Sequence, residues 1–415
     1  MRPGLSRIRR LLVLMNHPEH SFGCILVTGS NGKGTTCAVL ASCLRQLGWK
    51  AGLFTSPHLV SVRERFRVNG RPAPYAAMDR FLKQHGGACH RLGATYFETT
   101  TAFALWWFRE LGVEWAVLEI GLGGRLDACN AVEPKLSIVT SVSLEHVEVL
   151  GPTQAHIAAE KGGVARRDTP TFAGPLGESA LRSLSRTVRG TGGRLLRVGR
   201  HVRTSGVVST RKGSRFTLDA FGQRVHLHVP FAGRKAVVNA ALAASAAIYV
   251  CQTDRSGRGC AHWKRNLRRG VRIASLPARL EQVRRRPPVF VDVAHNEASV
   301  ISLVQDWQRL WPSRRPVLLT GLLDDKPALR IGRLLSRISD TLVITRPDSP
   351  RARSPEELAR TWRGLFGRVE VVDSPGRALS RALDLAGRGA LLVTGSHYVV
   401  GPLLTTLRRP GRGKL

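Results

Sequence analysis

The spacing of apolar residues near the N-terminus predicts a strand, a tight turn, a helix and a second strand. Residues 22–28 form a short apolar run typical of a buried strand, and residues 29–34 are rich in glycine. Residues 35–47 have the apolar period of a helix, and residues 51–55 form the next apolar run. This order is typical of a βαβ unit in a parallel sheet.

The pattern continues and then changes its period. Residues 99–111 are predicted to form a helix, and residues 115–120 and 136–141 are predicted to form strands. Between residues 194 and 229 the period shifts towards two, which predicts a small antiparallel sheet. An alanine-rich apolar helix is expected over residues 235–250.

A second alternation of strands and helices follows residue 276. The basic, glycine-punctuated segment 255–274 is expected to be a helix or a linker near a domain boundary. Beyond it, strands are predicted at residues 288–293, 316–321, 341–345, 369–372 and 390–394, and helices at residues 299–311 and 329–338. We therefore expect two α/β domains, residues 1–274 and residues 275–415.

Length and composition agree with two globular domains. The chain has 415 residues, of which 43% are hydrophobic. The longest N-terminal apolar run, residues 11–15, is too short for a signal peptide or a membrane span. The seven cysteines include no CxxC pair, which indicates reduced, buried thiols. We expect a cytoplasmic monomer without a membrane partner.

The net charge of +35 is unusual, and lysine accounts for only ten of the 64 basic residues. Nucleic-acid binding, affinity for a polyanionic small molecule, and a solvated arginine-rich surface all remain open. Short basic runs occur at residues 7–10, 265–272 and 284–286. No aromatic pattern typical of RNA-binding domains accompanies them, so nucleic acid is not expected as a partner.

The glycine-rich turn carries the clearest chemistry. Glycines let backbone N–H groups converge on phosphate oxygens, and the following helix adds its positive end. The strict pattern GxxxxGK[ST] fails, because Val27 stands at its first glycine and Gly34 separates the lysine from the threonines. The strand and helix around the turn favour a phosphate site over a turn without function. The predicted ATP contacts are Gly29, Ser30, Asn31, Gly32, Lys33, Gly34, Thr35 and Thr36.

This loop and the motifs after it resemble those of folylpolyglutamate synthases and their Mur-ligase relatives. The first motif, GSNGKGT, is similar to the family's GTNGKG[ST] loop. The others follow in family order: LFTSPHL from residue 53, TYFE from 95, LEIGLGGRLDA from 118, LEH from 144, EKGG from 160, VNAA from 238, PARLE from 277 and DVAHN from 292. Together they extend over most of the chain.

The resemblance implies a fold and a reaction. The fold is α/β: an N-terminal P-loop-type Mur-ligase central domain with a parallel sheet and a small antiparallel sheet, then a C-terminal Rossmann-like domain. The implied reaction uses ATP to activate a carboxylate of a folate-type acceptor, such as dihydropteroate or tetrahydrofolate, as an acyl phosphate. The amine of L-glutamate then displaces phosphate. Phosphoryl transfer of this kind needs positioning and charge neutralisation.

The resemblance also implies a metal site. Ser56, Glu119 and His146 match the family's magnesium ligands, although magnesium generally prefers oxygen donors. Lys161 matches a lysine that relatives carry as a carbamate. The alternatives are a capping or ion-paired acid for Glu119, a core histidine for His146, and an unmodified lysine beside phosphate for Lys161.

Further positions match substrate and nucleotide contacts of the family. The pterin or folate pocket corresponds to Thr95, Tyr96, Phe97, Glu98, Leu126, Asp127 and Ala128. Nucleotide contacts correspond to Asn239, Arg279 and Asp292, and positions near the reacting carboxylate or glutamate correspond to His295 and Ser396. Lys33, Lys161 and His295 are the predicted catalytic residues. Packing is the alternative role for the aromatic residues before a helix.

Some residues depart from the family pattern. Ser30 replaces the usual threonine, Glu145 replaces the aspartate before the metal histidine, and Glu297 replaces the usual proline after the DVAHN-type motif. Two other functions stay open on sequence alone. One is a Mur-type amide ligase for a different acid, and the other is a basic nucleotide-binding protein acting on nucleic acid.

Overall fold

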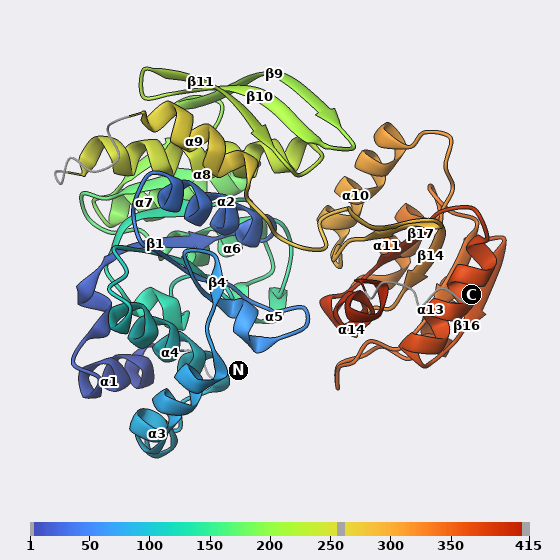
Figure 1. Cartoon of the computed structure of the whole chain (residues 1–415), viewed down its shortest axis with the longest axis horizontal. Coiled ribbons are helices and arrows are strands. Elements are labelled where there is room, and N and C mark those ends of the chain that lie inside the picture. The colour runs from blue at the N-terminus through green and yellow to red at the C-terminus, as the bar shows by residue number, and fades with distance from the viewer. Residues whose placement is uncertain (1–3, 255–261, 409–415) are drawn as a thin grey trace, which may run out of the picture. The chain divides into compact units, whose positions relative to one another are not determined.

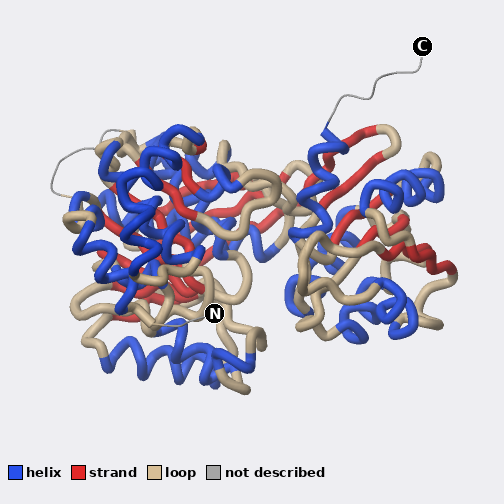
Figure 2. Tube along the Cα trace, turned by 90° about the horizontal axis from the view of Figure 1, so that it is seen from below, coloured by secondary structure: helices blue, strands red, loops and turns tan. Residues whose placement is uncertain are grey.

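The computed structural model describes residues 4–254 and 262–408, and its chain forms two units (Figure 1). Unit 1 comprises Met1–Pro57 and Val62–Leu276, and unit 2 comprises His58–Ser61 and Pro277–Leu415. Both units combine helices and strands along the whole of their chain (Figure 2).

The main sheet of unit 1 has eight strands in the order β4-β3-β2-β5-β1-β6-β7-β8. All neighbouring pairs are parallel except β2–β3 and β3–β4. Its strands are β1 Gly23–Thr28, β2 Ala51–Phe54, β3 Phe66–Val68, β4 Arg71–Pro72, β5 Trp115–Glu119, β6 Pro134–Val139, β7 Pro170–Ala173 and β8 Arg194–Arg197. Because β1 lies between β5 and β6, the residues that follow these three strands meet at one edge of the sheet.

Side chains of the central strand alternate between the two faces of this sheet. Ile25 and Val27 belong to the core under α2, α8 and α9, whereas Cys24 and Leu26 belong to the core under α1, α3 and α4. The helices of unit 1 are α1 Ser6–Leu14, α2 Lys33–Gln46, α3 Tyr75–Arg91, α4 Tyr96–Glu110, α5 Val147–Leu150, α6 Gln154–Gly162, α7 Glu178–Gly190, α8 Arg234–Thr253 and α9 Trp263–Arg272, with 3-10 turns η1 Pro18–Ser21, η2 Val62–Arg65 and η3 Ala128–Ala131.

A three-stranded antiparallel sheet covers α8. Its order is β11-β10-β9, with β9 Val202–Thr210, β10 Gly213–Ala220 and β11 Gln223–Val229. Phe216, Leu218 and Leu227 face the core shared with α8. The predicted antiparallel sheet is present, but its assignment was wrong for residues 194–197. These form β8, which pairs in parallel with β7 and lacks a period of two.

Among the described residues, α8 is the helix long and apolar enough to cross a membrane. Two thirds of its apolar window, 67%, is buried inside the structure. Small alanines between Ala240 and Ala247 let the main sheet and the antiparallel sheet approach it closely. Burial in the core therefore accounts for its apolar character.

Unit 2 contains a six-stranded sheet in the order β12-β13-β17-β14-β15-β16. Only the β12–β13 pair is antiparallel. Its strands are β12 Glu281–Arg285, β13 Pro288–Val291, β14 Val317–Thr320, β15 Thr341–Ile344, β16 Arg368–Val371 and β17 Leu391–Thr394. Its helices are α10 Glu297–Leu310, α11 Ala328–Leu335, α12 Pro355–Thr361, α13 Pro375–Ala386 and α14 His397–Arg408. The residues after β13 and β17 lie at neighbouring positions of one sheet edge.

The cysteines agree in part with the expected buried thiols. Cys24, Cys37, Cys43, Cys89 and Cys129 are buried and free, whereas Cys251 is free but only partly buried. Cys260 lies outside the described residues. Burial raises the pKa of the Cys24, Cys37 and Cys43 thiols well above the ordinary value, so these thiols stay protonated and unreactive.

Candidate nucleotide and metal site

The phosphate loop between β1 and α2 has room only for glycine at two positions. Gly29 and Gly32 have φ values of +143° and +88°. A Cβ at Gly29 would lie 1.9 Å from Oγ1 of Thr140, and a Cβ at Gly32 would lie 2.4 Å from Oδ1 of Asn239. The predicted nucleotide contact Asn239 on α8 is therefore packed directly against the loop.

Hydroxyl groups after β6 hold the loop in place. The backbone N–H of Asn31 donates to Oγ of Ser141 at 2.9 Å, and Oγ1 of Thr140 donates to the Asn31 carbonyl at 2.7 Å. The hydroxyl of Ser30 accepts a hydrogen bond from the N–H of Ser143 at 3.0 Å. Sequence analysis missed Thr140, Ser141 and Ser143. Their signal is a cluster of small hydroxyl residues directly after a strand.

Lys33 begins α2, and its ammonium group folds back over the loop. Its Nζ donates to the carbonyl of Gly29 at 2.7 Å and to that of Ser30 at 3.3 Å. The first turn of α2 leaves backbone N–H groups without intrahelical partners and carries the positive end of the helix dipole. A positive charge and backbone donors thus meet at the carboxyl end of β1, which suits a phosphate chain.

Oxygen atoms suited to a divalent cation gather beside this helix start. Glu119 ends β5, is buried, and accepts a hydrogen bond at Oε2 from the N–H of Ser56 at 3.0 Å. A Cβ at Gly34 would lie 3.7 Å from both carboxylate oxygens of Glu119. In the described part of the chain, Oγ1 of Thr36 is buried without a hydrogen-bond partner. A carboxylate and an unsatisfied hydroxyl are the donors that magnesium prefers, so these residues fit the ion.

His146 occupies an unusual backbone conformation on the same sheet edge. It is half-buried and directly precedes α5, with a φ of +46° in the left-handed region. Residues other than glycine adopt this conformation uncommonly, and such residues often mark functional sites. The structure thus places His146 in the segment after β6, next to the residues that support the phosphate loop.

A buried ion pair lies behind the loop. Nζ of Lys161 is 2.9 Å from Oε1 of Glu145, and the Lys161 side chain is 2% exposed. Burial lowers the pKa of Lys161 to about 8, although Glu145 opposes the shift. Burial disfavours the Glu145 carboxylate, but the Lys161 and Lys33 ammonium groups outweigh it and lower its pKa to about 2. The two predicted catalytic lysines therefore belong to one electrostatic cluster, with a glutamate that sequence analysis had not assigned to the site.

The residues at the start of α4, which are predicted to line the folate pocket, cap and pack this end of the helix. Thr95 and Glu98 form a capping box, in which Oγ1 of Thr95 accepts from the Glu98 N–H and Oε2 of Glu98 accepts from the Thr95 N–H. Glu98 also pairs with Arg7 at 3.1 Å. Phe97 covers Gly121, where a Cβ would lie 2.7 Å from its ring. Tyr96 is 60% exposed and is the member of this group that is open to a ligand.

The second predicted pocket segment is organised by Asp127. Its carboxylate accepts hydrogen bonds from the N–H groups of Gly121, Leu122 and Cys129, each at 3.0 Å. Burial raises its pKa to about 6, because it outweighs the stabilising backbone donors. Leu126 is exposed and Ala128 is buried. Asp127 thus shapes the loop, and Leu126 presents its side chain to solvent.

In unit 2, Asp292 follows β13, and its carboxylate links two backbone segments by hydrogen bonds. Its Oδ2 accepts from the N–H of Leu280 and its Oδ1 from the N–H of Ala294, both at 2.8 Å. Burial raises its pKa, while the guanidinium of Arg279 lowers it. Ala278 and Leu280, on either side of Arg279, both have positive φ values. Asp292 therefore braces the turn that contains Arg279, through the N–H of Leu280.

His295 and Ser396 lie after β13 and β17, at one edge of the unit 2 sheet. Nδ1 of His295 lies 2.8 Å from the Val293 carbonyl, which can only accept, so Nδ1 carries the proton. In the neutral ring Nε2 is then the basic nitrogen. Oγ of Ser396 accepts a hydrogen bond from the N–H of Tyr398 at 3.1 Å, and Ser396 is buried.

Comparison with known proteins shows the family to which this chain belongs. A family model for the Mur ligase middle domain matches residues 27–247, and one for the Mur ligase, glutamate ligase domain matches residues 278–397. The chain belongs to the folylpolyglutamate and dihydrofolate synthase family of Mur ligases. The predicted family and the predicted α/β fold class are both confirmed.

Three proteins of this family illustrate the similarity. A probable bifunctional folylpolyglutamate synthase/dihydropteroate synthase of Haloferax volcanii is 35% identical over 99% of this chain, which spans 49% of that relative. The dihydrofolate synthase/folylpolyglutamate synthase of Escherichia coli is 32% identical over 98% of this chain and 92% of the relative. The structure of Mycobacterium tuberculosis folylpolyglutamate synthase complexed with ADP has a TM-score of 0.91 and 28% identity, over 99% of this chain and 96% of that chain.

The raised pKa of Asp127 predicts a pH-dependent stability. The pKa rises from 3.8 to about 6 on folding, so the folded state binds more protons between these values. Wild-type stability should therefore fall by about 2 kcal/mol, relative to Asp127→Asn, as the pH rises from 4 to 7. Urea unfolding of both proteins across this range measures the difference. Parallel stability curves would show that the backbone donors, and not burial, dominate at this carboxylate.

Proposed function

We propose that this chain is an ATP-dependent ligase that joins L-glutamate to a carboxylate of a folate-type acceptor. The observation that supports it most is the set of Lys33, Glu119 and the Glu145–Lys161 pair around one glycine loop. Relatives named dihydrofolate synthase/folylpolyglutamate synthase, and one relative structure complexed with ADP, support the same reaction. The acceptor classes are dihydropteroate and tetrahydrofolate.

The proposed reaction has two steps. An oxygen of the acceptor carboxylate forms a bond to the γ-phosphorus of ATP as the bond to the β-phosphate oxygen breaks, which gives an acyl phosphate and ADP. The glutamate nitrogen then bonds to the acyl carbon, the bond to phosphate breaks, and the nitrogen loses a proton. The first step gains most from neutralised phosphate charge, and the second from exclusion of water.

The residues of unit 1 would serve the first step. Lys33 can exchange the carbonyls of Gly29 and Ser30 for phosphate oxygens, because an ammonium on a flexible stem has several donors. Thr36, Ser56, Glu119 and His146 are the proposed holders of magnesium. A bound magnesium ion would neutralise charge on the phosphates. Asn239 is a proposed nucleotide contact beside the loop.

The remaining site residues have proposed roles that follow from their chemistry. Arg279 and Asp292 are proposed to contact the nucleotide, and Ser396 is proposed to contact the acceptor or glutamate. Nε2 of His295 is a proposed acceptor for the proton that the glutamate amine releases, because Nδ1 is occupied by a carbonyl. Tyr96 and Leu126 are proposed to contact the acceptor, since both are exposed.

An ADP-release assay tests the proposed reaction. Release should require ATP, an acceptor and glutamate together, and mass spectrometry should find the acceptor extended by one glutamate. Lys33→Ala should lower this turnover at least about a hundredfold, because it removes charge neutralisation at the phosphates. The matched control, Lys83→Ala on an exposed position of α3, should keep wild-type turnover. Glutamate-independent ADP release, or full turnover in a folded Lys33→Ala protein, would refute the proposal.

The proposed metal role of Glu119 makes a separate prediction. Glu119→Gln should raise the magnesium concentration for half-maximal activity by about tenfold or more, because a neutral amide is a poorer ligand. Glu178→Gln, on an exposed position of α7, serves as the control and should leave the titration unchanged. Equal magnesium titrations for all three proteins would remove Glu119 from the metal site.

Lys161 can act in either of two forms. The family resemblance implies a carbamate, whereas the 2.9 Å contact with Glu145 favours the unmodified ammonium. A carbamate would set two anionic groups side by side in a buried place, which is costly without a cation between them. We expect activity to persist after removal of carbon dioxide and bicarbonate from the assay. Loss of activity that bicarbonate restores would instead establish the carbamate.

The cellular setting is also part of the proposal. Free, buried cysteines suit a reducing compartment, and the proposed substrates are metabolites, so we propose a cytoplasmic location. We also propose a monomer, for which size-exclusion chromatography with light scattering should report a mass near that of one chain, 45.4 kDa.

A further inference from the structure

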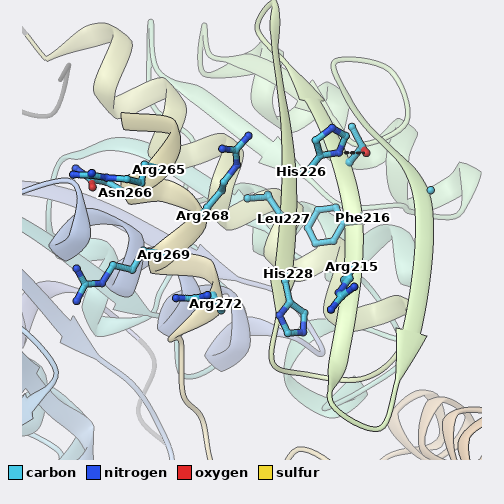
Figure 3. A pocket seen from close by; sticks show the side chains of 12 residues that line it. Arg215, Phe216, His226, Leu227, His228, Arg265, Asn266, Arg268, Arg269 and Arg272 are labelled. Carbon is cyan, nitrogen blue, oxygen red and sulfur yellow. Dashed lines mark hydrogen bonds between the residues drawn. The ribbon is translucent and has the colours of Figure 1, made fainter. Parts of the chain in front are cut away.

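An arginine-lined cleft lies in unit 1, away from the phosphate loop. It has a volume of about 950 Å³ and lies between α9 and the strands β10 and β11 (Figure 3). Its basic side chains are Arg215, His226, His228, Arg265, Arg268, Arg269 and Arg272. No aspartate or glutamate lines it among the described residues. The cleft is therefore a concave surface of one charge sign.

The five guanidinium groups have no carboxylate partners within the described ranges 4–254 and 262–408. Some exposed arginines elsewhere pair with acids, as Arg182 does with Glu178, whereas others, such as Arg186 and Arg189 on α7, are in no ion pair among the described residues. Placing like charges together costs free energy, and an anionic ligand removes this cost. The gathering of five guanidinium groups and no carboxylate in one concave cleft points to a ligand that brings its own negative charge.

The local fold fixes these groups on two walls. Arg265, Arg269 and Arg272 have the spacing of one helical stripe on α9, and Figure 3 shows them in a row along that helix. On the other wall, Arg215 pairs across the strands with His228. Nδ1 of His226 lies 2.9 Å from Oγ1 of Thr217, which holds that ring in place. Basic side chains from a helix and from a sheet therefore both line the cleft, and in Figure 3 those of Arg265 and Arg269 extend from α9 on the side away from the strands.

The lining favours phosphate groups over nucleic-acid bases. Apart from its two histidines, the described lining contains one aromatic residue, Phe216, and the ring of Phe216 is buried. The described lining therefore offers no exposed aromatic ring on which a base could stack. Guanidinium groups bind phosphate oxygens through paired N–H donors, and each phosphate offers more acceptor oxygens than a carboxylate does. A dense row of charges also suits closely spaced phosphates.

The cleft is separate from the proposed acceptor pocket. Helix α9 packs on α2, where Oγ of Ser42 donates to the Gly270 carbonyl at 2.7 Å, on the face of the main sheet that also carries α8. The α4 segment with Tyr96 lies on the opposite face. A glutamate chain on an acceptor bound there would have to pass round the sheet to reach these arginines.

From these observations we propose that the cleft between α9 and β11 binds a chain of phosphate groups, with inorganic polyphosphate as the ligand of matching chemistry. This site goes beyond the proposed ligase reaction and does not depend on it. A ligand there would contact α9, which packs directly on the helix that begins at Lys33. Charge from a bound polyphosphate would offset the local excess of arginine.

The test measures binding of fluorescently labelled inorganic polyphosphate to the full chain, with saturating ATP and magnesium to occupy the phosphate loop. Arg269→Ala/Arg272→Ala should weaken binding at least about tenfold, since two charge-assisted contacts are lost. Arg186→Ala/Arg189→Ala on α7 is the matched control, with the same charge change and the same spacing on an exposed helix. It should change affinity less than about twofold.

A further variant guards against local unfolding of α9. Arg215→Ala, on the opposite wall, should weaken polyphosphate binding without touching the helix. Equal losses in the α9 and α7 variants would overturn the proposal, because binding would then follow total charge alone. Cleft-dependent binding that is tighter for poly-γ-glutamate or single-stranded RNA of equal charge would overturn the assignment of the ligand class.

Discussion

The parallel pairing of β1 with β5 on one side and β6 on the other is the constraint on which the site depends. It brings the ends of three strands, far apart in the sequence, to one edge of a sheet. The glycine loop follows the first strand, Glu119 ends the second, and the hydroxyl residues that hold the loop follow the third. Backbone register thus sets the geometry before any ligand binds, which lowers the cost of organising the transition state.

Charge at this edge is balanced within the protein. Lys33 is satisfied by loop carbonyls, and Lys161 is satisfied by Glu145. A buried ion pair adds little net stability, but removing one partner leaves a costly unpaired charge. Glu145, which departs from the family pattern, is the residue whose carboxylate contacts Lys161.

Much of the fold could be predicted from the sequence, because the apolar periods are regular and the glycine loop has a strict local geometry. Lys33 and Glu119 were predicted from motifs, and the structure gives both a suitable setting. Residues 194–197 were assigned to the wrong sheet, since four residues carry too little pattern to choose a partner strand. Thr140 and Ser141 were missed, because their role arises from contacts with residues more than a hundred positions away.

Some residues that were predicted to contact the substrate also have structural roles. The T-x-x-E pattern at Thr95 and Glu98 is the sequence signal of a capping box, and the structure contains that box. The carboxylate of Asp127 accepts hydrogen bonds from three backbone N–H groups. The arginine run at residues 265–272 and the antiparallel sheet could both be predicted from the sequence, but the cleft between them could not, because tertiary packing joins them.

We propose that one loop and one carboxylate hold a nucleotide and its metal. A crystal structure with a non-hydrolysable ATP analogue and magnesium tests this most directly. We expect Nζ of Lys33 to leave the Gly29 carbonyl for a phosphate oxygen, and Glu119 and Thr36 to face the ion. Nucleotide bound elsewhere, with the Lys33–Gly29 contact intact and Glu119 turned away from the metal, would contradict it.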